Sequence, residues 1–367
     1  MRIRRIKKTE WRKIRAFNKS QYGAGHILCD KVYYDWQFDN VFNSSQKNYA
    51  ALGLFDKKDN IVGTIGLFRA PLNLFGRKAD CVWLANLIVK EELRSVGYGY
   101  LLLKEGVAGC DIGVDHNINK NARPVFLAAG WRGKDVSRYL CVLDKKKSER
   151  LMNKNNLRIK TFDELVKKSG KKTDLNFKEV NKIDRKFEDF WRKIKTKYPV
   201  SVERSSRYLN WRYLRHPMVD YRVFAAEKSN NLEAFLVLRI EEATEGKKRK
   251  RTGIRLGRIV DFVSLDGAEE FTLFKAVEFC RSQKLAFVDF FLTGDFYASA
   301  FRKAGFISDK KKPYSLIPTL FNPIDRIKRT RNNFAFKLVS KKLFNRKIDN
   351  FKFWYLTKGD GDQDRPY

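Results

Sequence analysis

The sequence is poor in the residues that form disulfide frameworks and metal sites. It has three histidines, and its five cysteines are scattered without a CxxC pair: Cys29, Cys81, Cys110, Cys141 and Cys280. An odd set of scattered thiols is typical of a reduced compartment, so we expect a cytoplasmic protein. Without a Cys/His cluster, we expect no structural zinc and no other metal.

Long apolar runs are also missing. No stretch approaches the ~20 apolar residues that span a bilayer. The basic segment at 1–17 has no continuous apolar segment after it. We therefore expect neither a membrane span nor a secretory signal.

Acidic residues are outnumbered, with 42 Asp and Glu against 77 Lys and Arg, which gives a net charge of +35. Such an excess is typical of proteins that bind polyanions: nucleic acid, an acidic membrane face or phosphate-bearing small molecules. A solvated lysine-rich surface explains it equally well, because much of the excess lies in short runs at 145–147, 247–251 and 310–312. Peripheral association with an acidic membrane surface stays open, and so does the oligomeric state.

Apolar residues, in contrast, are abundant enough for real cores, at 43% hydrophobic and 14% aromatic. The length of 367 residues favours two domains. Strand and helix patterns alternate twice along the chain, which predicts units at 1–145 and 201–367 joined by a polar, lysine-rich connector at 146–200. The expected fold class is α/β (α+β): two similar units in tandem, each a mixed, mostly antiparallel sheet flanked by helices.

Matching elements define the two units. Each begins with a hairpin, at 50–69 with a turn at 57–60 and at 221–240 with a turn at 229–231. A central apolar strand and a helix follow in each. A short helix then ends in AAGW at 128–131 and in KAGF at 303–306.

The stretch ELRSVGYGYLLLK at 92–104 lies between an apolar strand at 81–89 and a helix. The first N–H groups of a helix have no backbone partner and carry a positive partial charge, so they attract phosphate. Gly97 and Gly99 would let a ligand approach the backbone, and Arg94 adds a guanidinium fork for phosphate oxygens. The chemistry suits a pyrophosphate; a glycine turn for tight helix–strand packing is the structural alternative.

The pattern R-x-x-G-x-G after a central apolar strand, with a later helix that ends in AGW, resembles the Gcn5-related N-acetyltransferase (GNAT) superfamily. The resemblance covers about residues 1–145, and a weaker copy covers about 200–320. It implies acetyl-CoA as the cosubstrate, with its pyrophosphate on the backbone at 95–99. The residues assigned to the cofactor are Leu87, Ile88, Val89, Arg94, Ser95, Val96, Gly97, Tyr98, Gly99, Asn119 and Asn121.

The corresponding stretch of the second copy differs. SLDGAEE at 264–270 lacks the arginine and the glycine pair, and it carries three acids. Acids would repel a pyrophosphate. We therefore expect the cofactor in the first copy only.

N-acetylation needs a base for the proton of the amine and a donor for the oxyanion. We expect His116 to be the base, since it ends a short strand and a histidine pKa of about 6.5 suits a base near neutrality; a histidine at the core edge is the alternative. Asp115 would orient His116 or serve instead. Asn86, the lone polar residue of the central strand, aims at the substrate or pairs with backbone. Strand N–H groups from Leu87 to Val89 can supply the oxyanion contact.

One departure from the family pattern affects this mechanism. Family members often have a tyrosine four residues before the glycine of the short helix, as the acid that reprotonates the thiolate. The corresponding residues are Phe126 and Phe301, which cannot donate a proton. Either another group does so, or the thiolate leaves unaided.

The segment ERSSRYLNWRYLRHP at 203–217 predicts a helix that Pro217 stops. Its aromatic and basic residues are predicted to stack on a nucleotide base and hold its phosphates: Arg204, Tyr208, Trp211, Arg212 and Arg215. Packing of Trp211 in the core is the alternative. The acidic tail DGDQD at 360–364 lacks the glutamate of a calcium loop, and we expect it to fold onto basic residues.

The whole chain also resembles tandem-domain acetyltransferases of bacterial surface-polysaccharide pathways, through VYYDWQF (32–38), YLNWRYLRHP (208–217) and TKGDGDQDRPY (357–367). This implies an acetyl-CoA-dependent N-acetyltransferase that acts on a nucleotide-linked amino sugar. Two alternatives stay open. One is a tRNA-dependent aminoacyl transferase of cell-wall synthesis, which the charge favours and the intact RSVGYG hinge disfavours. The other is a basic nucleic-acid binder, although no helix-turn-helix, zinc-finger or RNP pattern is present, so we do not expect nucleic acid as a partner.

Overall fold

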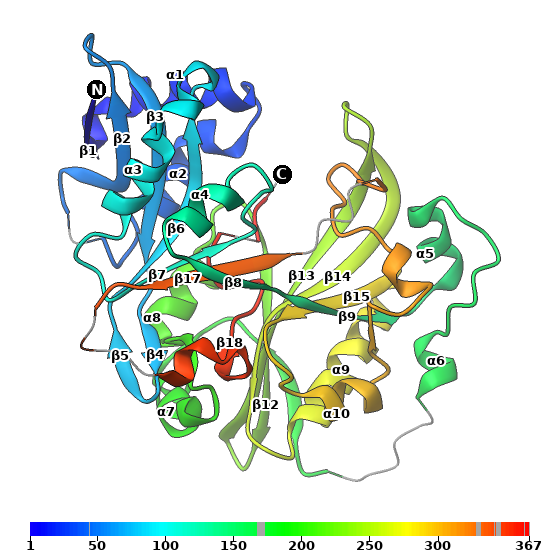
Figure 1. Cartoon of the computed structure of the whole chain (residues 1–367). Helices are drawn as coiled ribbons and strands as arrows, with labels where there is room; N and C mark the ends of the chain where they lie inside the picture. The colour runs from blue at the N-terminus through cyan, green and yellow to red at the C-terminus, as the bar shows by residue number, and fades with distance from the viewer. Residues whose placement is uncertain are drawn as a thin grey trace.

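Two seven-stranded sheets form the two lobes of the chain (Figure 1). The computed structural model describes residues 1–43, 45–166, 173–327, 332–340, 342, 346–362 and 364–366. Gln363 and Tyr367 of the predicted tail motif, and part of the predicted connector, lie outside the described residues. A third, four-stranded sheet combines strands from both halves of the sequence.

The strands are given in spatial order. The first sheet contains β1 (Arg2–Lys7), β2 (Asn48–Phe55), β3 (Ile61–Arg69), β6 (Cys81–Val89), β7 (Ile112–His116), β17 (Asn333–Leu338) and β8 (Arg132–Asp135). The second contains β10 (Asn176–Val180), β12 (Tyr221–Lys228), β13 (Asn231–Glu245), β14 (Lys250–Ser264), β15 (Phe287–Leu292), β9 (Ser137–Val142) and β16 (Ile307–Ser308). The small sheet contains β18 (Trp354–Tyr355), β11 (Val200–Val202), β4 (Leu72–Leu74) and β5 (Arg77–Ala79).

The helices flank these sheets. They are α1 (Trp11–Tyr22), α2 (Lys31–Phe38), α3 (Tyr98–Gly106), α4 (Arg123–Ala128), α5 (Lys145–Met152), α6 (Phe162–Leu165), α7 (Arg185–Ile194), α8 (Ser206–Leu209), α9 (Glu269–Ser282) and α10 (Ala298–Lys303). A π-helical turn at Asn210–Leu214 extends α8. The helix predicted before Pro217 is therefore present, in two parts.

The two large sheets correspond strand by strand. In each, one central pair is parallel, β6 with β7 and β14 with β15. The flanking pairs are antiparallel, including the hairpins β2–β3 and β12–β13. Both predicted hairpins are thus confirmed, and so is the expected fold class of two mixed, mostly antiparallel sheets flanked by helices.

The two lobes exchange one strand each. In the first sheet, the strand beside β7 is β17, from the second half of the sequence. In the second sheet, the equivalent place beside β15 is taken by β9, from the first half. Residues 137–142, predicted within the first unit, therefore pair in the second sheet, and residues 333–338 do the reverse. The division at 145 and 201 stays a prediction for the remaining elements.

Helix α7 lies in the segment that the sequence suggested to be a polar connector. Four of its residues are buried, at the spacing of one helical face: Phe187, Phe190, Trp191 and Ile194. Asp184 caps its start by accepting a hydrogen bond from the backbone N–H of Lys186. The connector thus contributes a helix to the largest core cluster.

A pair of tryptophans joins the lobes where two of the motifs noted in the sequence meet. Trp36 of α2 stacks on Trp211 of the π-helical turn, with ring centroids 5.2 Å apart. Each indole Nε1–H donates to the backbone carbonyl of the other tryptophan, at 3.0 Å in both directions. Trp211 therefore packs in the core, which is the structural alternative considered for it.

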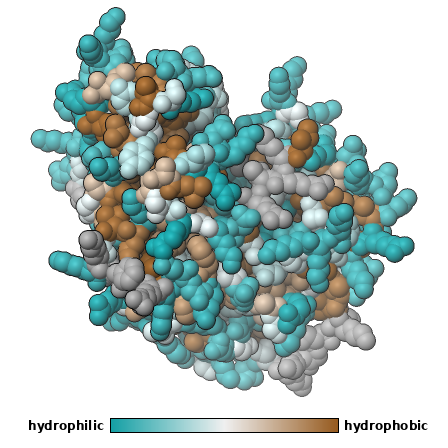
Figure 2. Space-filling view, viewed as in Figure 1, coloured by the Kyte–Doolittle hydropathy of each residue, from teal (hydrophilic) through white to brown (hydrophobic). Residues whose placement is uncertain are grey.

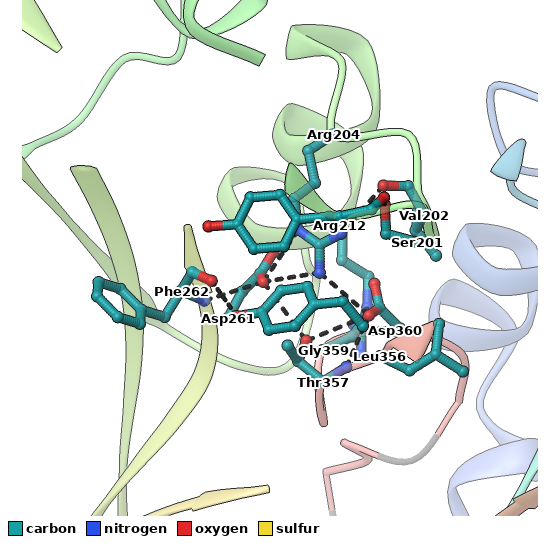
Figure 3. A network of polar contacts seen from close by, with 12 residues as sticks. Ser201, Val202, Arg204, Arg212, Asp261, Phe262, Leu356, Thr357, Gly359 and Asp360 are labelled. Carbon is teal, nitrogen blue, oxygen red and sulfur yellow. Dashed lines mark hydrogen bonds and ion pairs between the residues drawn. The ribbon is translucent and has the colours of Figure 1, made fainter. Parts of the chain in front are cut away.

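The acids of the tail are buried instead of lying on the surface, and Asp360 belongs to the polar network shown in Figure 3. Asp360 and Asp261 both pair with the fully buried guanidinium of Arg204, at 3.1 and 3.0 Å. Asp364 pairs with Arg239 at 3.1 Å. The expectation that the tail folds onto basic residues is confirmed, with the difference that these charges are buried.

Hydrophilic residues cover most of the face shown in Figure 2, and hydrophobic residues gather mainly over the first lobe. The exposed apolar side chains of the first half of the sequence include Val96, Tyr100, Leu101 and Leu127. Among the described residues, no helix has the length and apolar character to cross a membrane.

Candidate active site

The first sheet opens where β6 and β7 part. Their parallel pairing ends at Leu84 opposite Asp115, whereas β6 continues to Val89. A bulge in β6 accompanies the divergence: Asn86 has a φ of 55°, and the register against β3 shifts between the pairs Ala85–Gly66 and Ile88–Thr64. The bulge frees backbone groups of β6 from the ladder next to the opening.

The predicted phosphate hinge follows directly after β6. A 3-10 helix at Glu91–Val96 leads to Gly97, whose φ of 81° and ψ of 0° lie in the left-handed region. That conformation favours glycine. A Cβ built on Gly97 or Gly99 would have no neighbour within 4 Å. Tight packing therefore does not require Gly99, and the space above the hinge is open.

Arg94 lies on the exposed side of this hinge. Its Nε–H donates to the carbonyl of Val89 at 3.1 Å, which holds the guanidinium beside the end of β6. In the described part of the chain, no carboxylate pairs with it. The first N–H groups of α3, from Tyr98 onward, lack helical acceptors. The hinge therefore offers a guanidinium and backbone donors on one open surface, as an anion requires.

His116 lies on β7 immediately after the last residue that pairs with β6. Only 4% of it is exposed, and neither imidazole nitrogen has a hydrogen-bond partner of good geometry among the described residues. Burial lowers the pKa of His116 to about 3, and the nearby backbone of Asp360 offsets this only in part. The imidazole is therefore neutral and able to accept a proton, although burial makes it a weak base.

Asp115 and Asn86 lie on the two strands that form the opening. Burial raises the pKa of Asp115 well above its usual value, and the charge of Asp362 raises it further. The neutral form of this carboxyl is thus favoured. Asn86 accepts a hydrogen bond through Oδ1 from Nη1 of Arg365 at 2.7 Å, while its buried Nδ2 has no partner in the described residues. The three residues predicted for catalysis, His116, Asp115 and Asn86, therefore lie on the two strands that border one opening, and of the three His116 lines the adjoining pocket.

A pocket of about 260 Å³ adjoins His116. Its walls come from four parts of the chain: the loop after α1, the end of β7, the tip of the β13–β14 hairpin and the tail. The residues that line it are Gly25, His26, Ile27, His116, Asn117, Arg249, Asp362, Arg365 and Pro366.

The equivalent opening of the second sheet is filled by the tail. The parallel pairing of β14 and β15 ends at Ile259 opposite Phe290. Beyond it, the N–H of Gly359 donates to the carbonyl of Val260 at 2.7 Å. The N–H of Thr293 donates to the carbonyl of Leu356 at 2.9 Å. The tail thus bonds to both diverging strands and closes the space between them.

The hinge of the second copy also has a different charge pattern. Lys197 pairs with Asp266 at 2.5 Å and with Glu269 at 3.3 Å, and Lys303 pairs with Glu270 at 2.9 Å. The three acids are therefore neutralised by lysines of the same chain. This agrees with the expectation that the second hinge does not hold a pyrophosphate.

The residues predicted to bind a nucleotide substrate lie elsewhere. Arg204, Tyr208 and Arg212 are buried and have internal partners: Arg204 binds two carboxylates, Tyr208 OH lies 3.5 Å from Asp360, and Nε of Arg212 donates to the carbonyl of Gly359 at 2.7 Å. With Trp211 in the core, these four residues stabilise the tail and the contact between the lobes. We do not retain them as substrate ligands. Arg215 is exposed and is not among the pocket residues.

The predicted CoA-arm residues Asn119 and Asn121 are exposed before α4. Oδ1 of Asn119 accepts hydrogen bonds from the N–H groups of Asn121 and Ala122, both at 2.9 Å. Asn119 therefore also organises the turn that begins α4. The roles of both residues toward CoA stay predictions.

Of the residues that line the pocket, the sequence predicted only His116, and the charged residues that it missed are Arg249, Asp362 and Arg365. Arg249 lies in the run KKRKR, which the sequence shows only as a patch of charge. Asp362 and Arg365 pair with each other in the tail. Only the long-range packing of hairpin and tail against β7 brings these residues to His116.

Comparison with solved structures assigns the fold. A GCN5-related N-acetyltransferase from Anabaena variabilis ATCC 29413 aligns with a TM-score of 0.58 at 10% identity, over 92% of this chain and 73% of that chain. A conserved protein of unknown function from Enterococcus faecalis V583, a probable N-acyltransferase, aligns with a TM-score of 0.60 at 12% identity, over 94% and 74%. Saccharomyces cerevisiae N-myristoyltransferase with bound myristoyl-CoA aligns with a TM-score of 0.55 at 12% identity, over 97% and 84%.

These alignments cover almost the whole chain, so the fold is that of GNAT-like domains in tandem. At such low identity the likeness shows the fold alone. No family model matches the sequence, and no curated relative matches it.

Proposed function

We propose that the chain is an acyl-CoA-dependent N-acyltransferase that binds its cosubstrate in the first copy only. The observation that carries this proposal is the difference between two matched openings. The second is closed by the tail, whereas at the first Nδ2 of Asn86 and both imidazole nitrogens of His116 are buried without a hydrogen-bond partner among the described residues. Buried polar atoms usually have partners, so orphaned ones at one opening favour a ligand there.

The residues at the first opening suit a CoA thioester. Arg94 and the backbone at 95–99 would hold the pyrophosphate, since the surface above Gly97 and Gly99 is open. The backbone of Leu87, Ile88 and Val89 would receive the acyl end beside the bulge. When bound, the thioester would supply the electrophilic carbonyl. The acyl group proposed from the family resemblance is acetyl.

The proton of the amine has a receiver close to this carbonyl site. His116 is neutral and lines the pocket, and neither of its nitrogens has a hydrogen-bond partner within the described ranges. Asp115, whose neutral form is favoured, supports it as a donor rather than as a second base. A neutral imidazole in a pocket without excess negative charge does not stabilise the amine as an unreactive ammonium.

We propose a nucleotide-linked amino sugar as the acceptor. The resemblance to tandem acetyltransferases of surface-polysaccharide pathways and the net charge of +35 support this choice. A pocket of about 260 Å³ accommodates the amine-bearing sugar and leaves the nucleotide outside.

Calorimetric titration with CoA, acetyl-CoA and myristoyl-CoA tests the cofactor assignment. Removing the charge in Arg94→Ala should weaken binding about tenfold or more, the effect of one charge-assisted hydrogen bond. Gly99→Val should weaken it further, because the new side chain projects into the open space of the cradle. Arg302→Ala, which removes a charge from the second copy's hinge pocket, is the matched control and should bind normally.

Wild-type protein that binds no CoA compound, or an Arg94→Ala variant that binds as tightly as wild type, would overturn the assignment. Release of free CoA with UDP- and dTDP-linked amino sugars then tests the acceptor, with aminoacyl-tRNA as the competing arm. Turnover only with aminoacyl-tRNA would replace the amino sugar as the acceptor.

A further inference from the structure

We infer that Arg249 is a specificity-determining residue that binds an anionic group, phosphate or carboxylate, on the amine acceptor. The inference rests on the proposed function, which assigns the pocket beside His116 to the acceptor. It commits to an acceptor that carries a negative charge close to its reactive amine.

Arg249 reaches the pocket on an unusually long hairpin. β13 and β14 have 15 residues each and pair as far as Glu245 opposite Lys250, whereas β2 and β3 have 8 and 9 residues. The extra length carries the tip of the second lobe's hairpin to the walls contributed by the first lobe, Gly25 to Ile27 and His116. The turn is fixed by a hydrogen bond from the N–H of Arg249 to the carbonyl of Gly246 at 3.0 Å.

Among the basic residues of this tip, Arg249 alone lines the pocket. In the described part of the chain, no carboxylate pairs with its guanidinium. Arg251, two residues further on, points to a different place: its Nε lies 3.8 Å from Glu242 and its side chain is 84% exposed. The guanidinium of Arg249 is thus directed at the pocket, and no carboxylate of the described hairpin residues pairs with it.

The charges that face Arg249 leave the pocket positive. Arg365 and Asp362 pair with each other, and the imidazoles of His26 and His116 line the same space. A positive pocket disfavours a protonated amine. The pocket therefore does not bind the acceptor through a protonated amine. Arg249 can instead bind an anionic group elsewhere on the acceptor while the neutral amine faces His116.

Matched amines test this directly. Ethanolamine, O-phosphoethanolamine and β-alanine form one set, and glucosamine and glucosamine 6-phosphate form another. Each is titrated into CoA-saturated wild type, Arg249→Ala, Arg249→Lys and the control Arg251→Ala, which loses the same charge from the same tip. Release of CoA from acetyl-CoA is measured in parallel.

We expect the amines that carry a phosphate or carboxylate to bind at least about tenfold more tightly than the amines of the same set that lack one, in wild type and in Arg251→Ala. Arg249→Ala should abolish the preference, and Arg249→Lys should restore part of it. The phosphate and carboxylate arms then distinguish the two kinds of anion.

Three results would overturn the inference: no preference for the anionic member in wild type, the same preference in Arg249→Ala, or no binding of any anionic probe. CoA affinity, measured on the same samples, separates this failure from that of the proposed function. If CoA binding is intact, an anion preference that is missing in wild type or unchanged in Arg249→Ala contradicts only the role of Arg249.

Discussion

The two copies have the same strand order but use their central opening in opposite ways. Between β6 and β7 the opening is lined by polar atoms that have no partner in the described part of the chain, and it is followed by an exposed hinge with Arg94. Between β14 and β15 it is occupied by residues 356–360 and followed by a hinge whose acids pair with Lys197 and Lys303. The opening between the diverging parallel strands is therefore a candidate binding site in the first lobe, whereas in the second lobe it is the place where the tail packs.

The difference shows that strand topology supplies the space and that side chains and the tail decide its use. Asp261 on β14 and Asp360 on the tail both pair with Arg204. No such buried ion pair crosses the described part of the first opening. Single substitutions at the two openings and between the lobes test this difference.

The largest effect is expected when an ion pair between the tail and the second lobe is removed. Asp360→Ala removes one carboxylate from Arg204, whose side chain is 0% exposed. An incompletely compensated buried charge costs about 3–5 kcal/mol in the free energy of unfolding, with the lower end expected here because Asp261 remains. Urea denaturation measures it.

The matched control is Asp266→Ala, which removes a carboxylate that is 91% exposed and pairs with Lys197. It should change stability by less than about 1 kcal/mol. Equal costs for the two variants would mean that the tail does not close the second opening in the way described.

A smaller effect concerns pH and the first opening. His116 has a pKa of about 3 in the folded protein against about 6.5 in the unfolded chain. The unfolded state therefore takes up the proton first, and stability decreases as the pH falls from about 6.5 toward 3. Between pH 7 and pH 5 this residue alone accounts for about 2 kcal/mol.

His116→Gln should remove that part of the pH dependence, as measured by urea denaturation at both pH values. His216 provides the comparison, because burial also lowers its pKa to about 3 but its Nδ1 accepts hydrogen bonds from the N–H groups of Met218 and Val219, at 3.1 and 3.0 Å. His216→Gln should flatten the profile and also lower stability at pH 7. An unchanged profile in His116→Gln would contradict a buried neutral imidazole at the opening.

The smallest effect tests the contact between the lobes. Trp211→Phe keeps an aromatic ring against Trp36 but removes one of the two reciprocal hydrogen bonds. We expect a loss of about 1 kcal/mol in stability. Trp131→Phe is the control, since its buried Nε1 has no partner in the described residues; the two variants should therefore differ. Equal losses would show that the indole bonds between the lobes contribute nothing.

Local patterns predicted much of this fold. The hairpin turns, the helix α9 and the contrast between the two hinges follow from the spacing of apolar residues, glycines and charges over a few residues. The amphipathic spacing of Phe187, Phe190, Trp191 and Ile194 was also present, but the lysine-rich surroundings led to a prediction of connector for that segment.

Long-range pairing could not be predicted in the same way. The contact of Arg204 with Asp360 joins residues 156 positions apart, and no local pattern selects that partner among 42 acids. The aromatic–basic spacing at 204–215 was therefore interpreted as a binding face, although most of it is internal. Arg249 was missed for the same reason, because only the length of the hairpin brings it to His116.

The exchange of β9 and β17 has a consequence for the order in which the molecule is made. The sheet that carries the hinge lacks an interior strand until residue 338 has been synthesised, since β17 lies between β7 and β8. Chains usually fold domain by domain as they emerge from the ribosome. Here β7 and β8 each keep an unpaired edge while about two hundred further residues are synthesised, from the end of β8 to the end of β17. Completion of the first lobe is therefore a late event, and both lobes should become stable together.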